Sequence, residues 1–452
     1  MTTKKAPLGL WTATSLVTGN MVGSGIFLLP AALGVFGGIS LLGWIFTTLG
    51  AMTLAYVFAN LARHINGSGG PFIYTQQAFG DFWGFMVAWG YWFCIVSANA
   101  AIAIALVSYL TVFVPILAEN NLYAAITTLA IIWFLVWVNL RGVKEAGQLQ
   151  LVTTLVKVLP LLVIAIVGLF YINPDHFSPF NLSQESNLSA ISATAAITMW
   201  AFLGLESANI PANEIRDPKK NVPRAAILGT LIAAMIYIPV TIAVMGLIEP
   251  AELAQSNAPF AQAAAILFGS WAYYFIAAIA VISCFGALNG WTLCLGQVSL
   301  APAKQGLFLQ SFAKTSKRGV PAKAIVYSTV LVSLIVLMNF HRSLVEQFTF
   351  VILLSTLTSL LPYLVCTIVN LWLIKHKRNN LSHIKGHIAL SCIACGFSLW
   401  IIINTGFEAI AWGLVLLLCG IPLYFYLQGQ LLKRQEGDPL VKSLGQTEQD
   451  QA

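Results

Sequence analysis

Hydrophobic runs of about 20 residues, a length that spans roughly 30 Å of hydrocarbon, recur along the whole chain of 452 residues. Within these runs the apolar residues follow one another without the alternation that is typical of transmembrane β-strands. The pattern therefore predicts an all-α integral membrane protein. Twelve membrane-spanning helices are expected, over residues 10–33, 38–62, 82–116, 122–140, 149–172, 193–214, 224–248, 271–301, 324–340, 345–374, 387–404 and 408–430.

The composition agrees with this pattern. Hydrophobic residues make up 58% of the chain and charged residues only 9%, whereas a soluble domain carries about 25% charged residues. The seven cysteines lie in apolar segments, and the six histidines lie in or beside loops without the spacing of metal ligands. We therefore expect no metal site and no cofactor.

The two sides of the predicted bundle differ in charge. With the N-terminus inside the cell, all but two of the 23 lysines and arginines fall on the cytoplasmic side, and the exceptions are Lys157 and Arg342. Cytoplasmic loops of membrane proteins are enriched in basic residues. We therefore expect residues 1–9 and the tail 431–452 to be cytoplasmic. The net charge of +7 then reflects contact with membrane lipid, and no nucleic-acid partner is expected.

Two predicted spans are interrupted in the same way. The first reads GNMVGSGIFLLP from Gly19 to Pro30, and the sixth reads WAFLGLESANIP from Trp200 to Pro211. A break in a membrane helix frees backbone groups that lipid cannot satisfy. Matching breaks in two halves of a membrane protein indicate the substrate site of a secondary transporter. Close helix packing through small residues is the alternative for either motif alone.

The two breaks offer complementary ends for an α-amino acid. The break at Gly23–Gly25 would expose backbone N–H groups at the start of a half-helix, where a carboxylate is stabilised. The break at Gly204–Asn209 would expose carbonyl groups, which favour an ammonium group. The pair therefore predicts one binding site at the middle of the membrane.

These motifs, together with the loop DPKKNVP (Asp217–Pro223) and the tetrad GWTL (Gly290–Leu293), resemble the amino acid–polyamine–organocation superfamily. The resemblance covers residues 8 to about 430, and in particular it is to bacterial antiporters of the arginine–agmatine, lysine–cadaverine and putrescine–ornithine types. It implies transport of an amino acid or amine in the cell inner membrane. Because dimers occur among these proteins, a homodimer is one expected assembly.

The resemblance also implies the five-plus-five inverted repeat of the leucine-transporter type, with discontinuous first and sixth helices. The transporter domain is then 10–430, with repeat one at about 10–172, repeat two at about 193–374 and extra helices at 387–430. Substrate contacts and gates carry over to the matching positions of this chain. These are Asn20, Ser24, Gly25, Tyr91, Asn99, Trp200, Leu203, Glu206, Trp291 and Ser355.

Two ionisable residues lie in the interior of predicted spans. Glu206, in the second break, is the one acidic residue so placed, and a mid-membrane acid costs about 2.5–3.5 kcal/mol on insertion scales. It is expected to bind substrate, to organise a gate or to exchange a proton. The antiporters that the chain resembles typically lack a lysine at the position of Lys157, in the fifth span. Elsewhere in the superfamily a lysine here stands where sodium binds in sodium-coupled members, so sodium-independent transport is expected; partial snorkelling is the alternative.

Several functions remain open. Gln76 and Gln77 occupy a region where the putrescine–ornithine type has an acid, which favours an amino acid over a polyamine. Exchange of a basic amino acid for its decarboxylated amine competes with proton-coupled symport and with exchange of neutral amino acids. The sequence lacks the nucleotide-binding loop of a driven pump and the charge rings of a channel. A membrane enzyme is also disfavoured, because the span interiors hold no second acid to complete a catalytic set.

Overall fold

The computed structural model describes residues 8–23, 25–65, 70–141, 158–209, 215–316, 319–376 and 384–437. Ten helical segments of this described chain are long and apolar enough to cross a membrane. Eight are single helices: α3 (Ser40–His64), α5 (Asp81–Leu110), α7 (Asn121–Leu140), α10 (Pro218–Leu247), α13 (Ser270–Lys304), α15 (Ala322–Asn339), α16 (Leu344–His376) and α17 (Ile384–Ile403). The other two are α9 (Asn187–Met199) with the turns that follow it, and α18 (Phe407–Leu418) continued by α19 (Gly420–Gly437).

The two predicted interruptions are confirmed. The first predicted span divides into α1 (Leu10–Met21) and α2 (Leu29–Gly34), which the 3-10 turn η1 (Gly25–Phe27) separates. The sixth ends its α-helix at Met199 and continues as the 3-10 turns η4 (Trp200–Phe202) and η5 (Ser207–Asn209). Gly204 between these turns has φ = +105°, a conformation that glycine adopts without steric cost.

One predicted span is only partly described. Of the fifth span, expected over residues 149–172, the structure describes a helix at Val158–Gly168. Lys157 and Ser24 lie outside the described residues, as do the beginning of the N-terminal segment and residues 438–452 of the tail.

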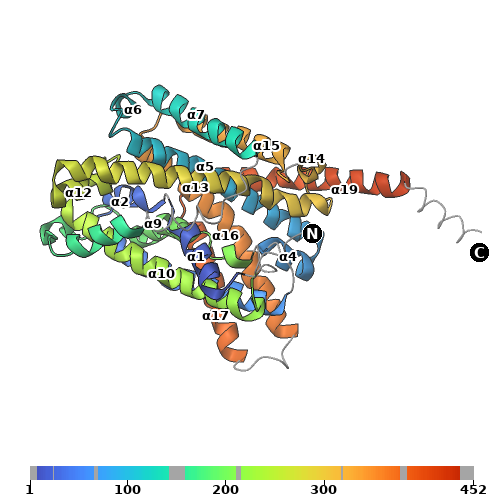
Figure 1. Ribbon diagram of the computed structural model, residues 1–452. Helices are drawn as coiled ribbons and strands as arrows, with labels where there is room; N and C mark the ends of the chain where they lie inside the picture. The colour runs from blue at the N-terminus through green and yellow to red at the C-terminus, as the bar shows by residue number, and fades with distance from the viewer. Residues whose placement is uncertain are drawn as a thin grey trace, which may run out of the picture.

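Two short helices precede long ones in the same manner. Both α4 (Pro71–Phe79) and α12 (Pro259–Phe268) begin with Pro-Phe and end with Phe-Gly. The glycines that follow, Gly80 and Gly269, have φ of +84° and +86° and allow the chain to turn sharply into α5 and α13. The helix α12 lies with α2 and α6 (Ile116–Glu119) at one end of the bundle, here called the mouth end. At the other, the base end, lie α4 and α14 (Gln310–Ala313) (Figure 1).

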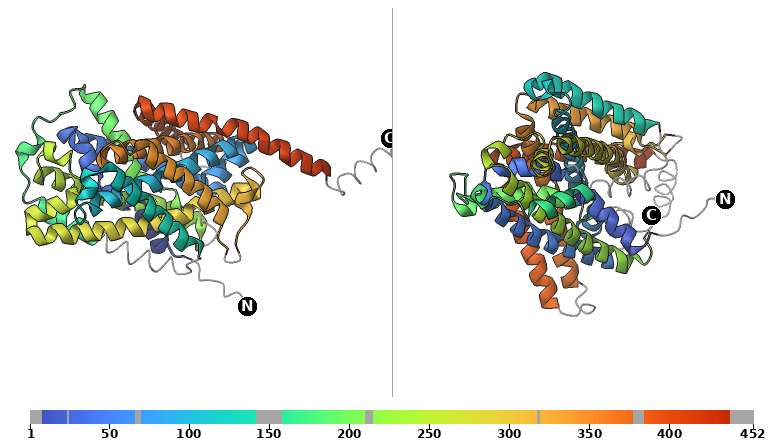
Figure 2. Two further views of the ribbon diagram at one scale, coloured as in Figure 1. Left: turned by 90° about the horizontal axis from the view of Figure 1, so that it is seen from above. Right: turned by 60° about the vertical axis from the view of Figure 1, so that its left-hand side comes forward.

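The centre of the bundle is α5. In its most apolar window 94% of the residues are buried, and it contacts both α13 and α16 over much of its length. By contrast, α17 and α18 lie at the periphery, with 28% and 17% of their windows buried (Figure 2). Side chains on α5 therefore face other helices rather than lipid, which is where a polar site can be held.

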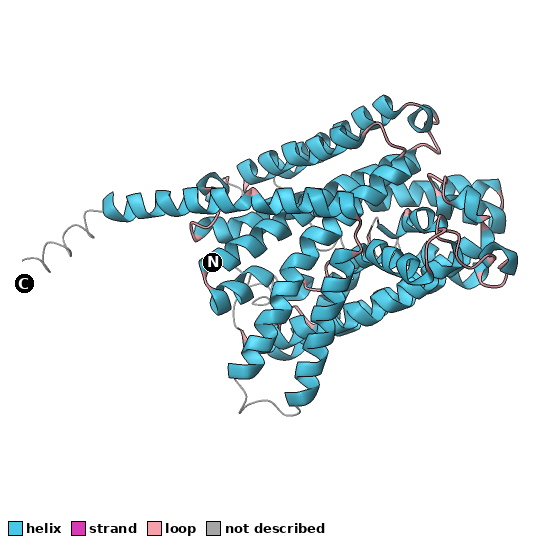
Figure 3. Cartoon of the chain, turned by 180° about the vertical axis from the view of Figure 1, so that it is seen from behind, coloured by secondary structure: helices cyan, strands magenta, loops and turns pink. Residues whose placement is uncertain are grey.

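Figure 3 shows the helices of the described chain and the loops that join them at the two ends of the bundle. Charged residues at these two ends differ in sign. Acidic residues border the mouth end, among them Glu119, Glu252 and Glu408, and the one described lysine or arginine there is Arg342, between α15 and α16. The described basic residues at or beside helix ends on the base side are Arg63, Arg141, Arg216, Lys219, Lys220, Arg224, Lys304, Lys314, Lys323, Lys375 and Lys385. The charge asymmetry expected from the sequence is therefore present between the two ends.

Candidate functional site

The two breaks lie against each other at the centre of the bundle. The turn η1 contacts η4, and α1 contacts η5. The ring of Trp200 covers Gly25 so closely that a methyl group at this glycine would lie 1.8 Å from Cζ3 of the ring. A residue without a side chain is therefore required at Gly25 for the aromatic ring to lie on the first break.

A small cavity lies between the breaks and α5. It measures about 40 Å³, and because one water needs roughly 10–15 Å³, it has room for a few water molecules. Predicted site residues that line it are Asn20, Gly25, Tyr91, Trp200, Leu203, Glu206 and Trp291, joined by Met21, Gly23, Cys94, Ile95, Ala98, Ile102 and Gly204. At this volume the cavity is too small for an amino acid, so a ligand of that size requires part of its wall to move.

Glu206 joins three elements at the base side of the cavity. The residue is 1% exposed. One carboxylate oxygen accepts a hydrogen bond from the Tyr91 hydroxyl of α5, and the other accepts one from the Tyr363 hydroxyl of α16. Both oxygens of the buried acid are thereby satisfied, as burial of such a group requires. The acid holds the second break to the two helices that flank it.

Tyr363 was not predicted from the sequence. It follows Pro362 in α16 and lies eight residues, about two turns, beyond Ser355. A polar aromatic residue beside a mid-helix proline was the available signal. Without the fold, nothing local relates it to Glu206, which lies 157 positions earlier.

On the mouth side a pair of rings closes the cavity. Trp200 meets Phe348 of α16 edge to face, with ring centres 5.5 Å apart. Tyr363 lies 15 residues further along the same helix, a rise of about 22 Å. The helix α16 therefore carries one closing residue on each side of the cavity.

Two further predicted residues lie behind the cavity lining. The amide of Asn99 donates to the carbonyl oxygens of Ile95 at 2.9 Å and of Trp291 at 3.3 Å. The Ser355 hydroxyl donates to the carbonyl oxygen of Cys94 at 3.0 Å. Both residues thus hold backbone next to cavity-lining side chains, and direct substrate contact by either stays a prediction. Ser24 and Lys157 lie outside the described residues.

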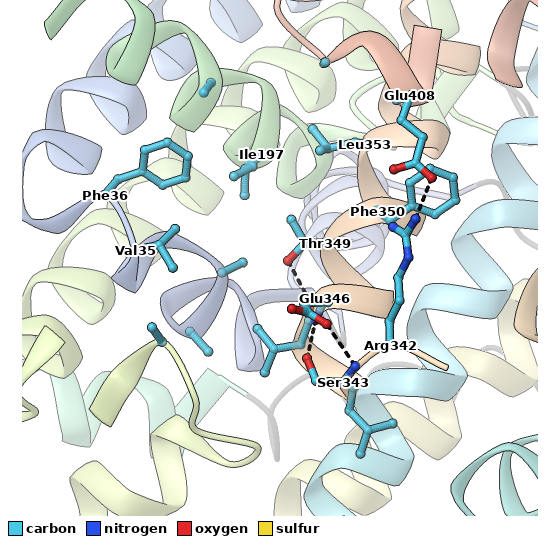
Figure 4. A pocket seen from close by; sticks show the side chains of 18 of the residues that line it. Val35, Phe36, Ile197, Arg342, Ser343, Glu346, Thr349, Phe350, Leu353 and Glu408 are labelled. Atoms are coloured by element: carbon cyan, nitrogen blue, oxygen red, sulfur yellow. Dashed lines mark hydrogen bonds and ion pairs between the residues drawn. The ribbon is translucent and has the colours of Figure 1, made fainter. Parts of the chain in front are cut away.

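A larger cavity opens at the mouth end (Figure 4). It measures about 1100 Å³ and is bordered by α2, α9, the beginning of α16 and the beginning of α18. Ile197 lines it one turn before Trp200 lines the small cavity. The two cavities are therefore consecutive along α9, with the Trp200–Phe348 contact between them. No group of three or more histidine, cysteine or acidic side chains that could hold a metal ion occurs in the described part of the chain.

Comparison with known proteins places this arrangement in a family. A family model described as amino acid permease matches residues 8–424. The putrescine transporter PotE of Escherichia coli K12 is 32% identical over 424 residues, covering 93% of this chain and 96% of the relative. PotE of Haemophilus influenzae is 33% identical over 426 residues, with coverage of 94% and 98%. The cadaverine/lysine antiporter of E. coli K12 is 35% identical over 337 residues, covering 74% of this chain and 76% of the relative.

Proposed function

This chain belongs to the amino acid permease family, and we propose that it is a secondary-active antiporter of basic amino acids and their decarboxylated amines. It is a multi-pass membrane transporter rather than an enzyme. Relatives that transport putrescine or exchange cadaverine for lysine support this substrate class. The observation that carries the proposal is the small cavity between two broken helices, with Glu206 and two tryptophans in its wall.

The chemistry of the cavity wall suits a cationic amine with an aliphatic stem. In this proposal the first break binds the substrate carboxylate through backbone N–H groups, and the second break and Glu206 bind an ammonium group. The α5 face at Ile95, Ala98 and Ile102 is apolar and fits methylene groups. Trp200 and Trp291 provide ring faces for a second cationic group, a contact worth about 2 kcal/mol when desolvated.

The inverted repeat receives support from paired contacts. The second, third and fourth predicted spans (α3, α5 and α7) contact the seventh, eighth and ninth (α10, α13 and α15), each at the corresponding position of the other half. The matching Pro-Phe and Phe-Gly ends of α4 and α12 lie before corresponding spans and at opposite ends of the bundle. We propose twelve spans, with residues 10–172 and 193–374 as the repeats, 387–430 as the added helices and 10–430 as the domain.

The charge distribution supports an orientation in a bacterial inner membrane. The base end, with its many basic residues, is assigned to the cytoplasm, and both termini are assigned there with it. The mouth cavity then opens to the outside. Lipid, and in a homodimer a second copy of the chain, covers the exposed apolar surfaces of peripheral helices such as α17 and α18.

Coupling is assigned to two residues. Glu206 is the proposed site of proton exchange or of contact with the substrate ammonium. Lys157 is the proposed replacement for sodium, as inferred from the sequence. Glu206 and its two tyrosines supply a place where a change of charge would release two helix contacts at once.

Counterflow in proteoliposomes tests the function. Radiolabelled lysine, arginine and ornithine are offered outside, and the lumen holds the same amino acid, its decarboxylated amine, a neutral amino acid or buffer alone. Uptake is expected only with a basic amino acid or amine inside. Uptake into substrate-free vesicles under a proton gradient would identify a symporter instead, and counterflow confined to neutral amino acids would identify a neutral exchanger.

A further inference from the structure

The mouth cavity contains a guanidinium group that is already bound. Arg342 is the one described lysine or arginine at this end, and its Nη2 lies 2.5 Å from Oε1 of Glu408. Its Cζ lies 4.8 Å from the centre of the Phe350 ring. Figure 4 shows the side chain reaching toward Glu408 beside that ring. A carboxylate and an aromatic face thus hold an organic cation within the cavity that leads to Trp200.

A carboxylate and aromatic rings also line the small cavity between the two breaks, where Glu206, Trp200 and Trp291 form part of the wall. Phe350 and Glu408 line the mouth cavity together with Ile197 of α9, which lies one turn before Trp200. A cation held at Glu408 and Phe350 is therefore inside the cavity that reaches the turn before Trp200.

The other carboxylate of this region is engaged elsewhere. Glu346 accepts a hydrogen bond from the backbone N–H of Ser343 at 3.0 Å, and the Ser343 hydroxyl accepts one from the backbone N–H of Glu346 at 3.3 Å. This reciprocal pair caps the beginning of α16. Of these two carboxylates, Glu408 is the one that is paired with a cationic side chain.

The ion pair between Arg342 and Glu408 can break while the protein stays folded. The side chain of Arg342 is 26% exposed and that of Glu408 is 52% exposed, so water reaches both, and such ion pairs are weak. The backbone of Arg342 is fixed separately, because its carbonyl oxygen accepts from Gln347 at 2.9 Å. The guanidinium can leave Glu408 while the loop stays in place.

We propose that Glu408 and Phe350 form an outer binding site for the ammonium or guanidinium group of a transported substrate, and that Arg342 occupies this site until a substrate displaces it. The site receives the cation from the mouth cavity before the Trp200–Phe348 closure opens. Arg342 is therefore a competitor within the protein. This inference rests on the proposed function, since it takes the substrate to be a basic amino acid or a diamine.

The test compares the KM for external lysine in proteoliposomes loaded with saturating lysine or cadaverine. R342Q removes the competitor and is expected to lower KM about fivefold, the combined strength of a partly exposed ion pair and a partly exposed cation–π contact, with kcat unchanged. R342K keeps a cation and is expected to retain the wild-type KM. R342Q/E408Q is expected to lose the gain, because the carboxylate is absent. E119Q, which removes a charge from the same end without touching Arg342, serves as the matched control.

An unchanged KM in R342Q, or an equal KM in R342Q and R342Q/E408Q, would overturn the proposal. A fall in kcat alone would also overturn it and would identify the ion pair as a structural tie. Wild-type protein that exchanges no basic amino acid or diamine would overturn the proposed function first, and the outer site with it. The two failures are therefore distinguishable in the same assay.

Discussion

Replacement of Tyr363 by phenylalanine tests whether the Glu206 contacts close the base side of the cavity. The change keeps the ring, which packs edge to face on Phe58 at 5.0 Å between centres, and removes only the hydroxyl that donates to Glu206. The Tyr91 hydroxyl remains as the second donor. The perturbation is therefore the loss of one hydrogen bond to a buried carboxylate.

The expected change in the open fraction follows from the energy of a hydrogen bond to a charged carboxylate. A hydrogen bond to a charged group contributes about 1.5–3 kcal/mol, and about 1.4 kcal/mol changes an equilibrium tenfold. If the bond is made only when the base side is closed, its loss raises the open fraction about 10- to 150-fold. Cys94 lines the cavity one turn beyond Tyr91 and reports this opening.

The assay measures the rate at which a membrane-impermeant thiol reagent labels Cys94 from the cytoplasmic side, in a background with the other six cysteines replaced by alanine. Y363F is expected to raise the rate at least tenfold. Y237F is the matched control, because the Tyr237 hydroxyl is also buried but donates to the backbone carbonyl oxygen of Ala201 at 3.1 Å rather than to the carboxylate of Glu206. Rates that agree within twofold for Y363F and the parent would refute the closing role of this contact.

Three further predictions, two on substitutions and one on the buffer cation, address the site itself. E206Q is expected to leave the protein folded, with a similar melting temperature, but to cut exchange at least tenfold or abolish its pH dependence; wild-type exchange with an unchanged pH profile would count against a role for the acid. G25A places a methyl group 1.8 Å from the Trp200 ring and is expected to destabilise the protein by about 1–3 kcal/mol and to stop exchange, which melting curves and counterflow measure; normal transport would show that the ring does not need this glycine. If the ammonium group of Lys157 replaces a bound sodium ion, exchange is expected at equal rates in sodium and choline buffers. A strict sodium requirement would overturn that assignment.

The sequence predicted the breaks because their cause is local. Glycines and small polar residues in the middle of an apolar run weaken the helix wherever the run is placed, and a glycine at position 204 permits the positive φ found there. The position of Glu206 was equally visible, since an acid among apolar residues stands out in any sequence. These local signals indicated the two breaks and the acid, whereas Tyr91 and Trp291 in the cavity wall were named from the family resemblance.

The partners of these residues were not visible, because they depend on how the helices pack. Tyr363 and Phe348 are ordinary residues for a membrane helix, and only the fold brings them to Glu206 and Trp200. Asn99 shows the converse, because its position was predicted but its hydrogen bonds run to the backbone of Ile95 and Trp291. A resemblance carries a residue to a position, whereas the packing decides what the side chain touches there.

The placement of both closures on α16 constrains how the site can open. Phe348 contacts Trp200 on the mouth side, and Tyr363 contacts Glu206 on the base side. Both residues belong to one helix, α16 (Leu344–His376), which contains Pro362, and a packed helix moves as a unit more readily than it bends. A tilt of the segment between these two residues about its middle, near Ser355, moves its two ends in opposite directions. If α16 tilts in this way, opening at the mouth would press Tyr363 toward Glu206, an arrangement in which the site is open to one side at a time.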